Sequence, residues 1–378
     1  MKKIIFILYT LTLLLLVLFS YGFIDPNLIY YKKIFSNFAF ENRLATTLLY
    51  SLFIVVLFLF YFAFIFLVSQ KKLHMKEIKF LIMITCVILL FAYPAMLSYD
   101  IFNYIVTAKV LFFYHENPYI IMPMEFTGDP MLLFTHAANK VALYGPGWIL
   151  FTGIPHVLGM GNFFITIMSF KLMAIVFYLL VLVLIWRLSR NLLSLSLFAF
   201  NPLILIEVLL GNHNDIVMLV LTLLSFLSIK KKHYFLAICF FLGSVLIKYA
   251  TIFLLPVFLF LLWKAYKQRE INWQKIYFAS FIAMLLVFFL SPLREEMYPW
   301  YAVWFLPFIF LIPDRKNVLY LSIAFSFGLL LRYVPFMYSG THFGITPVLR
   351  ILLASLPLGI TALYLLLSSR LKWRSLIK

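Results

Sequence analysis

The chain consists of long apolar runs separated by short polar or basic connectors. A helix rises ~1.5 Å per residue, so roughly 20 apolar residues cross a hydrocarbon core of about 30 Å. About twelve runs predict such crossings, at residues 4–24, 46–69, 80–97, 163–186, 193–210, 215–229, 233–247, 250–263, 276–292, 300–312, 317–333 and 345–369. We therefore predict an all-α, polytopic membrane protein with about 12 spans.

Composition supports this class. Hydrophobic residues make up 65% of the 378 residues, charged residues 12%, and mean hydropathy is +1.05. A soluble domain is about half apolar and about a quarter charged. The first run follows Met1-Lys2-Lys3 and lacks a small-residue cleavage site, so we expect a retained span rather than a signal peptide. Cys86 and Cys239 lie inside apolar runs, which favours core positions over a disulfide or metal pair.

Basic residues mark one side of the predicted membrane. They cluster at every second connection, which by the positive-inside rule predicts that both termini are cytoplasmic. The predicted cytoplasmic segments hold 21 of the 31 basic residues and three of the 13 acidic ones. They account for the whole net charge of +18, so nucleic-acid binding is not needed to explain it. We expect a multi-pass protein of the cell membrane whose active site faces outward.

Residues 98–162 form the largest predicted outer segment. Its apolar piece from Ile149 to Leu158 is too short to cross and predicts an interfacial or re-entrant helix. Farther along, Lys248 interrupts residues 234–263, which predicts a tight hairpin with this lysine at its outer tip. With no repeat, low-complexity linker or soluble domain visible, we expect a single membrane domain over 1–378 with a catalytic outer loop at about 98–162.

Three charged residues stand in apolar surroundings. Asp100 follows the run 80–97 directly, Glu207 lies about two turns inside an apolar helix, and Lys248 is flanked by apolar residues on both sides. Such placement is costly without a partner or a function. We expect them, with polar and aromatic residues of the same face, to form a site.

Simpler explanations compete at several positions. Trp and Tyr side chains near a membrane boundary often form only an interfacial belt. Arg294 beside Glu295 and Glu296 is also typical of a solvated ion pair. The segment 213–215 is also typical of a helix N-cap. No HxxEH or CxxC spacing is present, so we predict no protein-built metal site, and a divalent cation stays open as a cofactor.

A carboxylate base, a cation and aromatic rings at one membrane face suit sugar transfer from a lipid-linked phosphosugar. The carboxylate deprotonates the acceptor hydroxyl and the cation holds the departing phosphate. The alternative is a secondary transporter or lipid flippase with Asp100, Glu207 and Lys248 as substrate or proton sites. Transporters place such charges near the midplane of inverted repeats, which this chain does not show. A non-catalytic scaffold ranks third.

Several motifs occur in order between about Phe80 and Pro307. They are Ser98-x-Asp100-x-x-x-Tyr104, Asn117-Pro118-Tyr119, Tyr144-Gly145-Pro146, Asn201-Pro202 through Glu207 to Gly211-Asn212-His213-Asn214-Asp215, Leu246-Ile247-Lys248-Tyr249, and Pro299-Trp300-Tyr301-x-x-Trp304-x-x-Pro307. In these motifs the chain resembles polyprenyl-phosphate-sugar-dependent glycosyltransferases of the GT-C fold, and it is most similar to the bacterial polyprenol-phosphomannose-dependent mannosyltransferase branch.

The resemblance implies an inverting transfer of mannose or another hexose from a polyprenyl-phosphate sugar to an envelope glycan or glycolipid. It implies that Asp100 is the general base and that Lys248 and Arg294 bind the donor phosphate. Many members carry a second acid where this chain has Ser98, so we expect no substitute for Asp100 nearby. The substrate-binding residues it implies are Tyr104, Asn117, Tyr119, Tyr144, Glu207, His213, Asp215, Trp300 and Tyr301.

Overall fold

The protein is all-helical in a computed structural model that describes residues 2–28, 38–293 and 296–376. No β-strand occurs within these ranges. Asparagine side chains cap several helices, as Asn162 does by accepting hydrogen bonds from the backbone N–H groups of Phe164 and Ile165. The polytopic helical fold predicted from the apolar runs is confirmed.

The first half of the chain supplies the helices that flank the outer segment. They are α1 (Lys2–Ser20), η1 (Tyr21–Phe23), α3 (Phe38–Glu41), α4 (Arg43–Ser69), α5 (Met75–Leu90), η2 (Pro94–Met96), α6 (Asp100–Phe112), η3 (Pro123–Glu125), η4 (Pro130–Leu133), α7 (Pro146–Gly159) and α8 (Phe163–Ser189).

The second half is a succession of shorter and more broken helices. They are α9 (Leu192–Ala199), α10 (Pro202–Ile204), η5 (Leu205–Leu210), α11 (Asp215–Lys230), α12 (Tyr234–Ile247), η6 (Tyr249–Leu254), α13 (Leu255–Tyr266), α14 (Trp273–Leu290), η7 (Ser291–Leu293), η8 (Pro299–Trp304), α15 (Leu306–Phe310), α16 (Lys316–Leu331), α17 (Val334–Ser339) and α18 (Thr346–Leu376).

Seven helical segments in the described part of the chain are long and apolar enough to cross a membrane, and an eighth counts if the bent pair 192–199 and 202–210 is one span. These eight correspond to eight of the twelve predicted runs. The other four form α5 and α11 with 16 residues each, α12 with 14, and the broken pair η8 and α15. Twelve crossings therefore stay a prediction.

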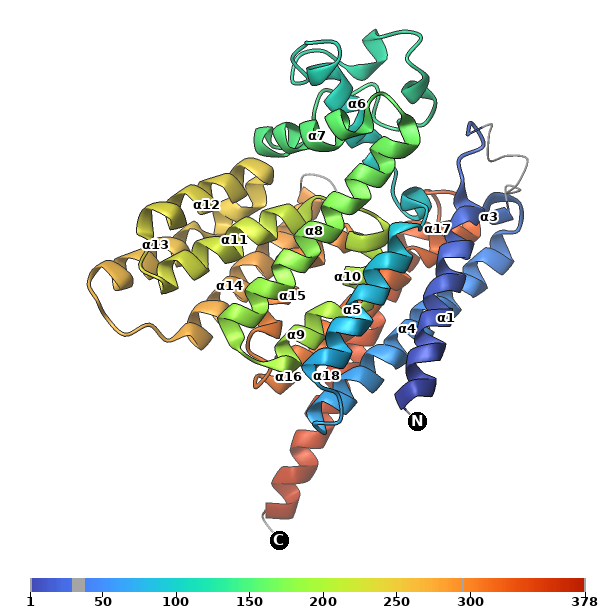
Figure 1. The fold of residues 1–378 in the computed structure, drawn as a ribbon. Coiled ribbons are helices and arrows are strands. Elements are labelled where there is room, and N and C mark those ends of the chain that lie inside the picture. The colour runs from blue at the N-terminus through green and yellow to red at the C-terminus, as the bar shows by residue number, and fades with distance from the viewer. Residues whose placement is uncertain (1, 29–37, 294–295, 377–378) are drawn as a thin grey trace.

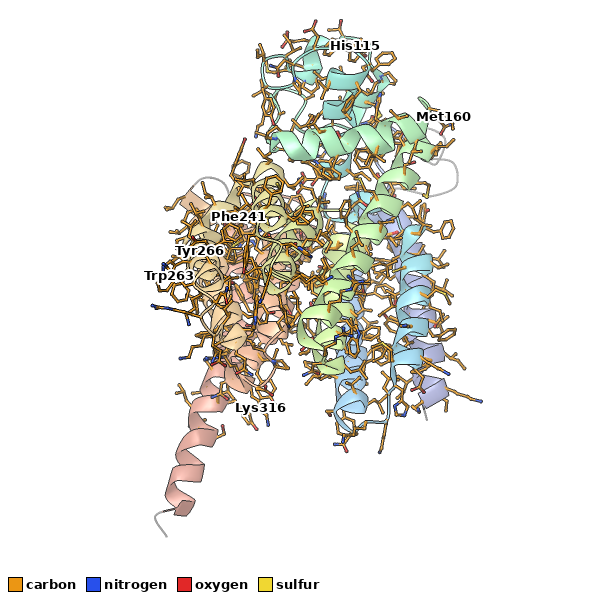
Figure 2. All side chains as sticks on the ribbon, turned by 60° about the vertical axis from the view of Figure 1, so that its left-hand side comes forward. His115, Met160, Phe241, Trp263, Tyr266 and Lys316 are labelled. Carbon is orange, nitrogen blue, oxygen red and sulfur yellow. The ribbon has the colours of Figure 1, made fainter. Side chains whose placement is uncertain are left out.

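Both termini lie at one end of the bundle, and the segment carrying α6 and α7 caps the opposite end (Figure 1). Figure 2 shows the same polarity, with His115 and Met160 at the capped end and Lys316 toward the other. The helix predicted around Ile149 to Leu158 is α7, which packs on α6, α8 and α12 and lies across the bundle end in Figure 1.

A close backbone approach fixes α7 against α12. A Cβ on Gly145 would lie 2.1 Å from the backbone oxygen of Leu246, and one on Gly147 would lie 3.1 Å from the same atom. Only glycine permits this contact. It fastens the start of α7 to the last turn of α12, and Lys248 follows directly.

Candidate active site

A buried imidazole joins two carboxylates that are far apart in sequence. His213 Nδ1 lies 3.4 Å from Asp100 Oδ2, and His213 Nε2 lies 3.3 Å from Glu207 Oε2. The N–H directions do not meet hydrogen-bond geometry, so the contacts are ion pairs. The side chain of Asp100 is 25% exposed and that of Glu207 only 1%. Asp100 is therefore the carboxylate of the pair that a substrate can reach.

The turn between η5 and α11 places the imidazole. η5 is a π-helix, a form common at functional sites, and it widens the coil at Glu207. Asn212 then adopts a left-handed backbone with φ of +63°, which asparagine tolerates better than most residues. Gly211 allows the tight turn, because a Cβ there would lie 3.3 Å from the His213 ring. The turn at Gly211 and Asn212 therefore directs the His213 side chain back towards Glu207.

The charge on His213 follows from its neighbours. Burial by itself lowers the pKa of an imidazole, but the interactions with Asp100 and Glu207 outweigh it and raise the pKa of His213 to about 9. At neutral pH the ring is an imidazolium between two acids. It compensates their charge and holds one oxygen of Asp100 in place.

Aromatic rings cover the imidazole. His213 stacks on Trp300 with ring centroids 4.0 Å apart, and Trp300 stacks on Tyr298 at 4.4 Å. Both aromatic residues precede or begin η8, which packs on α11. Flat rings next to a carboxylate are the surface that sugar faces and lipid-linked substrates bind.

A second charge pair lies beside the first. Lys248 Nζ donates to Asp215 Oδ1 at 2.7 Å, and the Trp304 indole N–H donates to the same oxygen. The ammonium also lies 4.5 Å from the centre of the Tyr301 ring, a cation–π contact. The Asp215 side chain is fully buried, whereas that of Lys248 is 22% exposed.

Tyr104 links the two charge pairs. Its hydroxyl accepts the backbone N–H of Asn214 at 3.4 Å, and its ring packs on Tyr144 and Trp148 at 4.9 Å each. Burial, reinforced by the charge of Asp100, raises the pKa of Tyr104 well above its usual value. The phenol is therefore neutral at all physiological pH values.

Two predicted site residues, Asn117 and Tyr119, lie elsewhere. The Asn117 side chain accepts the backbone N–H of Tyr119 and shapes an exposed turn, while the Tyr119 hydroxyl donates to the backbone oxygen of Tyr144. They support the start of α7 rather than reach Asp100. Arg294 falls outside the described residues.

Three contributors were not singled out from the sequence. Tyr333 donates its hydroxyl to Glu207 Oε1 at 3.0 Å. The buried Lys171 donates to the backbone oxygens of Leu209 and Leu210 at 3.1 and 3.4 Å, at the end of η5. Arg350 pairs with Glu296, as Arg332 does. Lys171 could have been identified from the sequence, because it is a lysine inside an apolar run.

Within the described part of the chain, no group of three or more His, Cys, Asp or Glu side chains is placed to hold a metal ion. The divalent cation left open from the sequence stays untested.

The protein is a polytopic helical membrane protein that carries a carboxylate, paired charges and stacked aromatic rings at one end. These features are typical of a membrane glycosyltransferase. The comparison with known families agrees. The family model described as Alpha-(1->6)-mannopyranosyltransferase, N-terminal domain, matches residues 8–265, and the chain belongs to this family. It is therefore a mannosyltransferase-like glycosyltransferase. No curated protein and no solved structure matches the chain.

The matched range includes Asp100, Glu207, His213, Asp215 and Lys248. The aromatic segment after residue 296 and both arginines at Glu296 lie beyond it. The resemblance to a bacterial mannosyltransferase branch predicted from ordered motifs is confirmed, and a sugar donor and a glycan acceptor follow from the family.

Proposed function

We propose that the protein transfers mannose from a polyprenyl-phosphate donor to an envelope glycan or glycolipid, with inversion and with Asp100 as general base. One observation supports this most directly. Asp100 is a partly exposed carboxylate with one oxygen paired to the imidazolium of His213, and the Trp300 ring stacks on that imidazole. Its other oxygen is not part of that ion pair and can accept a proton.

The transfer is a single displacement. The acceptor hydroxyl gives its proton to Asp100, and its oxygen attacks C1 of the mannosyl group from the face opposite the phosphate. The bond between C1 and the phosphate oxygen breaks, and its electron pair leaves with that oxygen. The products are the lengthened glycan and polyprenyl phosphate, and the configuration at C1 is inverted.

His213, Glu207 and Tyr333 support the base in this scheme. The imidazolium orients Asp100 and is itself held by Glu207, whose second oxygen accepts the Tyr333 hydroxyl. Glu207 lies behind the ring and is buried, so we assign it no proton transfer from the acceptor. A chain of charged and hydrogen-bonded groups of this kind reduces reorganisation during the reaction.

Lys248 is the donor-side cation of the proposal. Its side chain is partly exposed, and a phosphodiester carries one negative charge that a single ammonium can meet. Tyr301 and Trp304 hold the ammonium in place. We assign Trp300, Tyr301, Tyr104 and Tyr144 to sugar binding. Trp300 stacks on His213 and Tyr301 lies under the Lys248 ammonium, while Tyr104 packs on Tyr144.

We place the α6–α7 end on the outer face and both termini in the cytoplasm. The basic connectors support this orientation, since Lys316 lies toward the end opposite His115 (Figure 2). A polyprenyl chain would then lie among the apolar helix surfaces below the capped end.

The test uses purified protein in lipid bilayers with a panel of polyprenyl-phosphate sugars, following release of polyprenyl phosphate. We expect Asp100→Asn, which keeps size and removes the base, to lose at least about 10²-fold in kcat. Lys248→Ala should mainly raise KM for the donor. Glu116→Gln, an exposed acid of the same outer segment, serves as the matched control with unchanged turnover.

Turnover of no donor by the wild type, or full turnover by Asp100→Asn, would refute the proposal. The anomeric configuration of the product checks inversion separately. If Glu207→Gln abolishes transfer while Asp100→Asn does not, the base is Glu207 and the roles of the two carboxylates are exchanged.

A further inference from the structure

Two arginines converge on one carboxylate oxygen near the proposed site. Arg332, which follows α16, donates to Glu296 Oε1 at 2.6 Å, and Arg350 in α18 forms an ion pair with the same oxygen at 2.7 Å. Their side chains are only 6% and 12% exposed, whereas that of Glu296 is 35% exposed. The carboxylate is therefore the outward face of a mostly buried guanidinium pair.

This cluster carries more positive charge and more donors than Glu296 can satisfy. Among the described residues, two guanidinium groups against one carboxylate leave a net charge of +1, and the buried Nε of both arginines has no hydrogen-bond partner there. Buried donors and charges of this kind are costly unless an anion satisfies them. At Lys248, by contrast, one ammonium faces one carboxylate, that of Asp215.

Two short connections join the cluster to the candidate active site. Arg332 is followed by Tyr333, whose hydroxyl reaches Glu207. Glu296 is two residues from Tyr298, which stacks on Trp300 and through it on His213. The guanidinium pair is therefore linked to the candidate active site through Tyr333 and Glu207 and through the stacked rings of Tyr298 and Trp300.

The chemistry of the proposed reaction indicates which anion fits. The donor is a phosphodiester with one negative charge, and the product is a phosphate monoester with a charge of about −1.5 to −2 at pH 7. Planar guanidinium forks bind such groups bidentately, and two forks suit three terminal oxygens better than one carboxylate oxygen does. The arginine pair therefore favours the product over the donor.

We infer that Arg332 and Arg350 form a seat for the phosphate monoester of the released polyprenyl phosphate, and that Glu296 is a built-in competitor for this seat. The inference rests on the proposed function for the identity of the lipid. Glu296 pairs with the two arginines when no phosphate monoester is bound. The monoester displaces it, and the return of Glu296 promotes product release.

Binding without turnover tests the seat. Labelled farnesyl phosphate is titrated into the full-length protein in nanodiscs without sugar or acceptor, with farnesol, methyl farnesyl phosphate and inorganic phosphate as comparisons. We expect the monoester to bind about 10-fold or more tighter than the diester, and Arg350→Lys to weaken it by a similar factor, because a charged bidentate contact is lost. Glu296→Gln should tighten binding about 10-fold, because it removes the competitor's charge.

Arg43→Lys is the matched control, since Arg43 lies against Gly340 and donates to the backbone oxygen of Met337 at 3.5 Å. It should leave the affinity unchanged. The inference is overturned if Glu296→Gln melts like the wild type but binds farnesyl phosphate with unchanged or weaker affinity. It is also overturned if farnesol binds as tightly as farnesyl phosphate. Inorganic phosphate competing as strongly as farnesyl phosphate overturns the lipid assignment.

The two proposals fail separately. If farnesyl phosphate binds as expected while the wild type transfers no sugar, the proposed function fails and the phosphate seat stands. If Asp100→Asn abolishes transfer while Glu296→Gln and Arg350→Lys leave binding unchanged, the seat fails and the glycosyltransferase mechanism stands.

Discussion

The imidazolium of His213 makes the stability of this protein depend on pH in a defined window. The perturbation is His213→Gln, which keeps a polar side chain and removes the charge between Asp100 and Glu207. A rise in pKa from 6.5 to about 9 on folding corresponds to about 3 kcal/mol. Because His213 is fully buried, solvent screens little of this free energy.

The sign follows from linkage. A group whose pKa rises on folding contributes its full stabilisation below its unfolded pKa and loses it as pH rises through the folded value. The contribution of His213 is therefore complete below about pH 6.5 and gone above about pH 9. We expect the wild-type free energy of unfolding to fall by up to about 3 kcal/mol across this interval from this residue alone.

Unfolding followed by tryptophan fluorescence in detergent or bicelles, at intervals from pH 6 to 10, measures this dependence. His213→Gln should be less stable than the wild type at pH 6.5, and the difference should shrink as pH rises. His233→Gln, at an exposed position, should keep the wild-type slope. Turnover of the wild type should also decline above about pH 9, when Asp100 loses its cationic neighbour. Parallel stability curves for His213→Gln and the wild type would refute the reasoning.

Two backbone contacts give further predictions. Gly145→Ala should lower stability by about 1–3 kcal/mol or more, since its Cβ would lie 2.1 Å from the backbone oxygen of Leu246. Gly359→Ala is the control, because the space around Gly359 is open. Equal melting temperatures for Gly145→Ala and the wild type would contradict the close approach. Lys171→Met should destabilise by about 1–3 kcal/mol, because the carbonyls at the end of η5 lose their donor. Thermal unfolding and turnover check it, and Lys171→Arg should recover part of both; full activity in Lys171→Met would count against this role.

The helical class of the protein was predictable because it depends on local sequence. Apolar runs of sufficient length have few alternatives to a helix in a membrane, since every backbone polar group must be satisfied within the segment. The breaks were harder to predict. Asn201-Pro202 begins a short helix that passes into η5, and residues 300–312 form η8 and α15, because buried neighbours hold these irregular stretches in place.

The candidate site was predictable in part for a related reason. Asp100, Glu207 and Lys248 stand out because a charge in an apolar run is costly anywhere, whatever its partner. The partners themselves are distant in sequence. Nothing in the order of residues says that Lys248 pairs with Asp215, or that Glu207 lies behind the His213 ring with Tyr333 on its far side.

The sequence by itself determined the membrane class, the approximate helices, the residues with unusual chemistry and, through ordered motifs, the family. Only the tertiary structure decided which of these residues meet. His213 lies between Asp100 and Glu207, and Arg350 joins Arg332 at Glu296, because packing of helices far apart in the chain fixes side-chain distances. Charge pairing acts over a few ångströms, and sequence order does not specify such distances between remote segments.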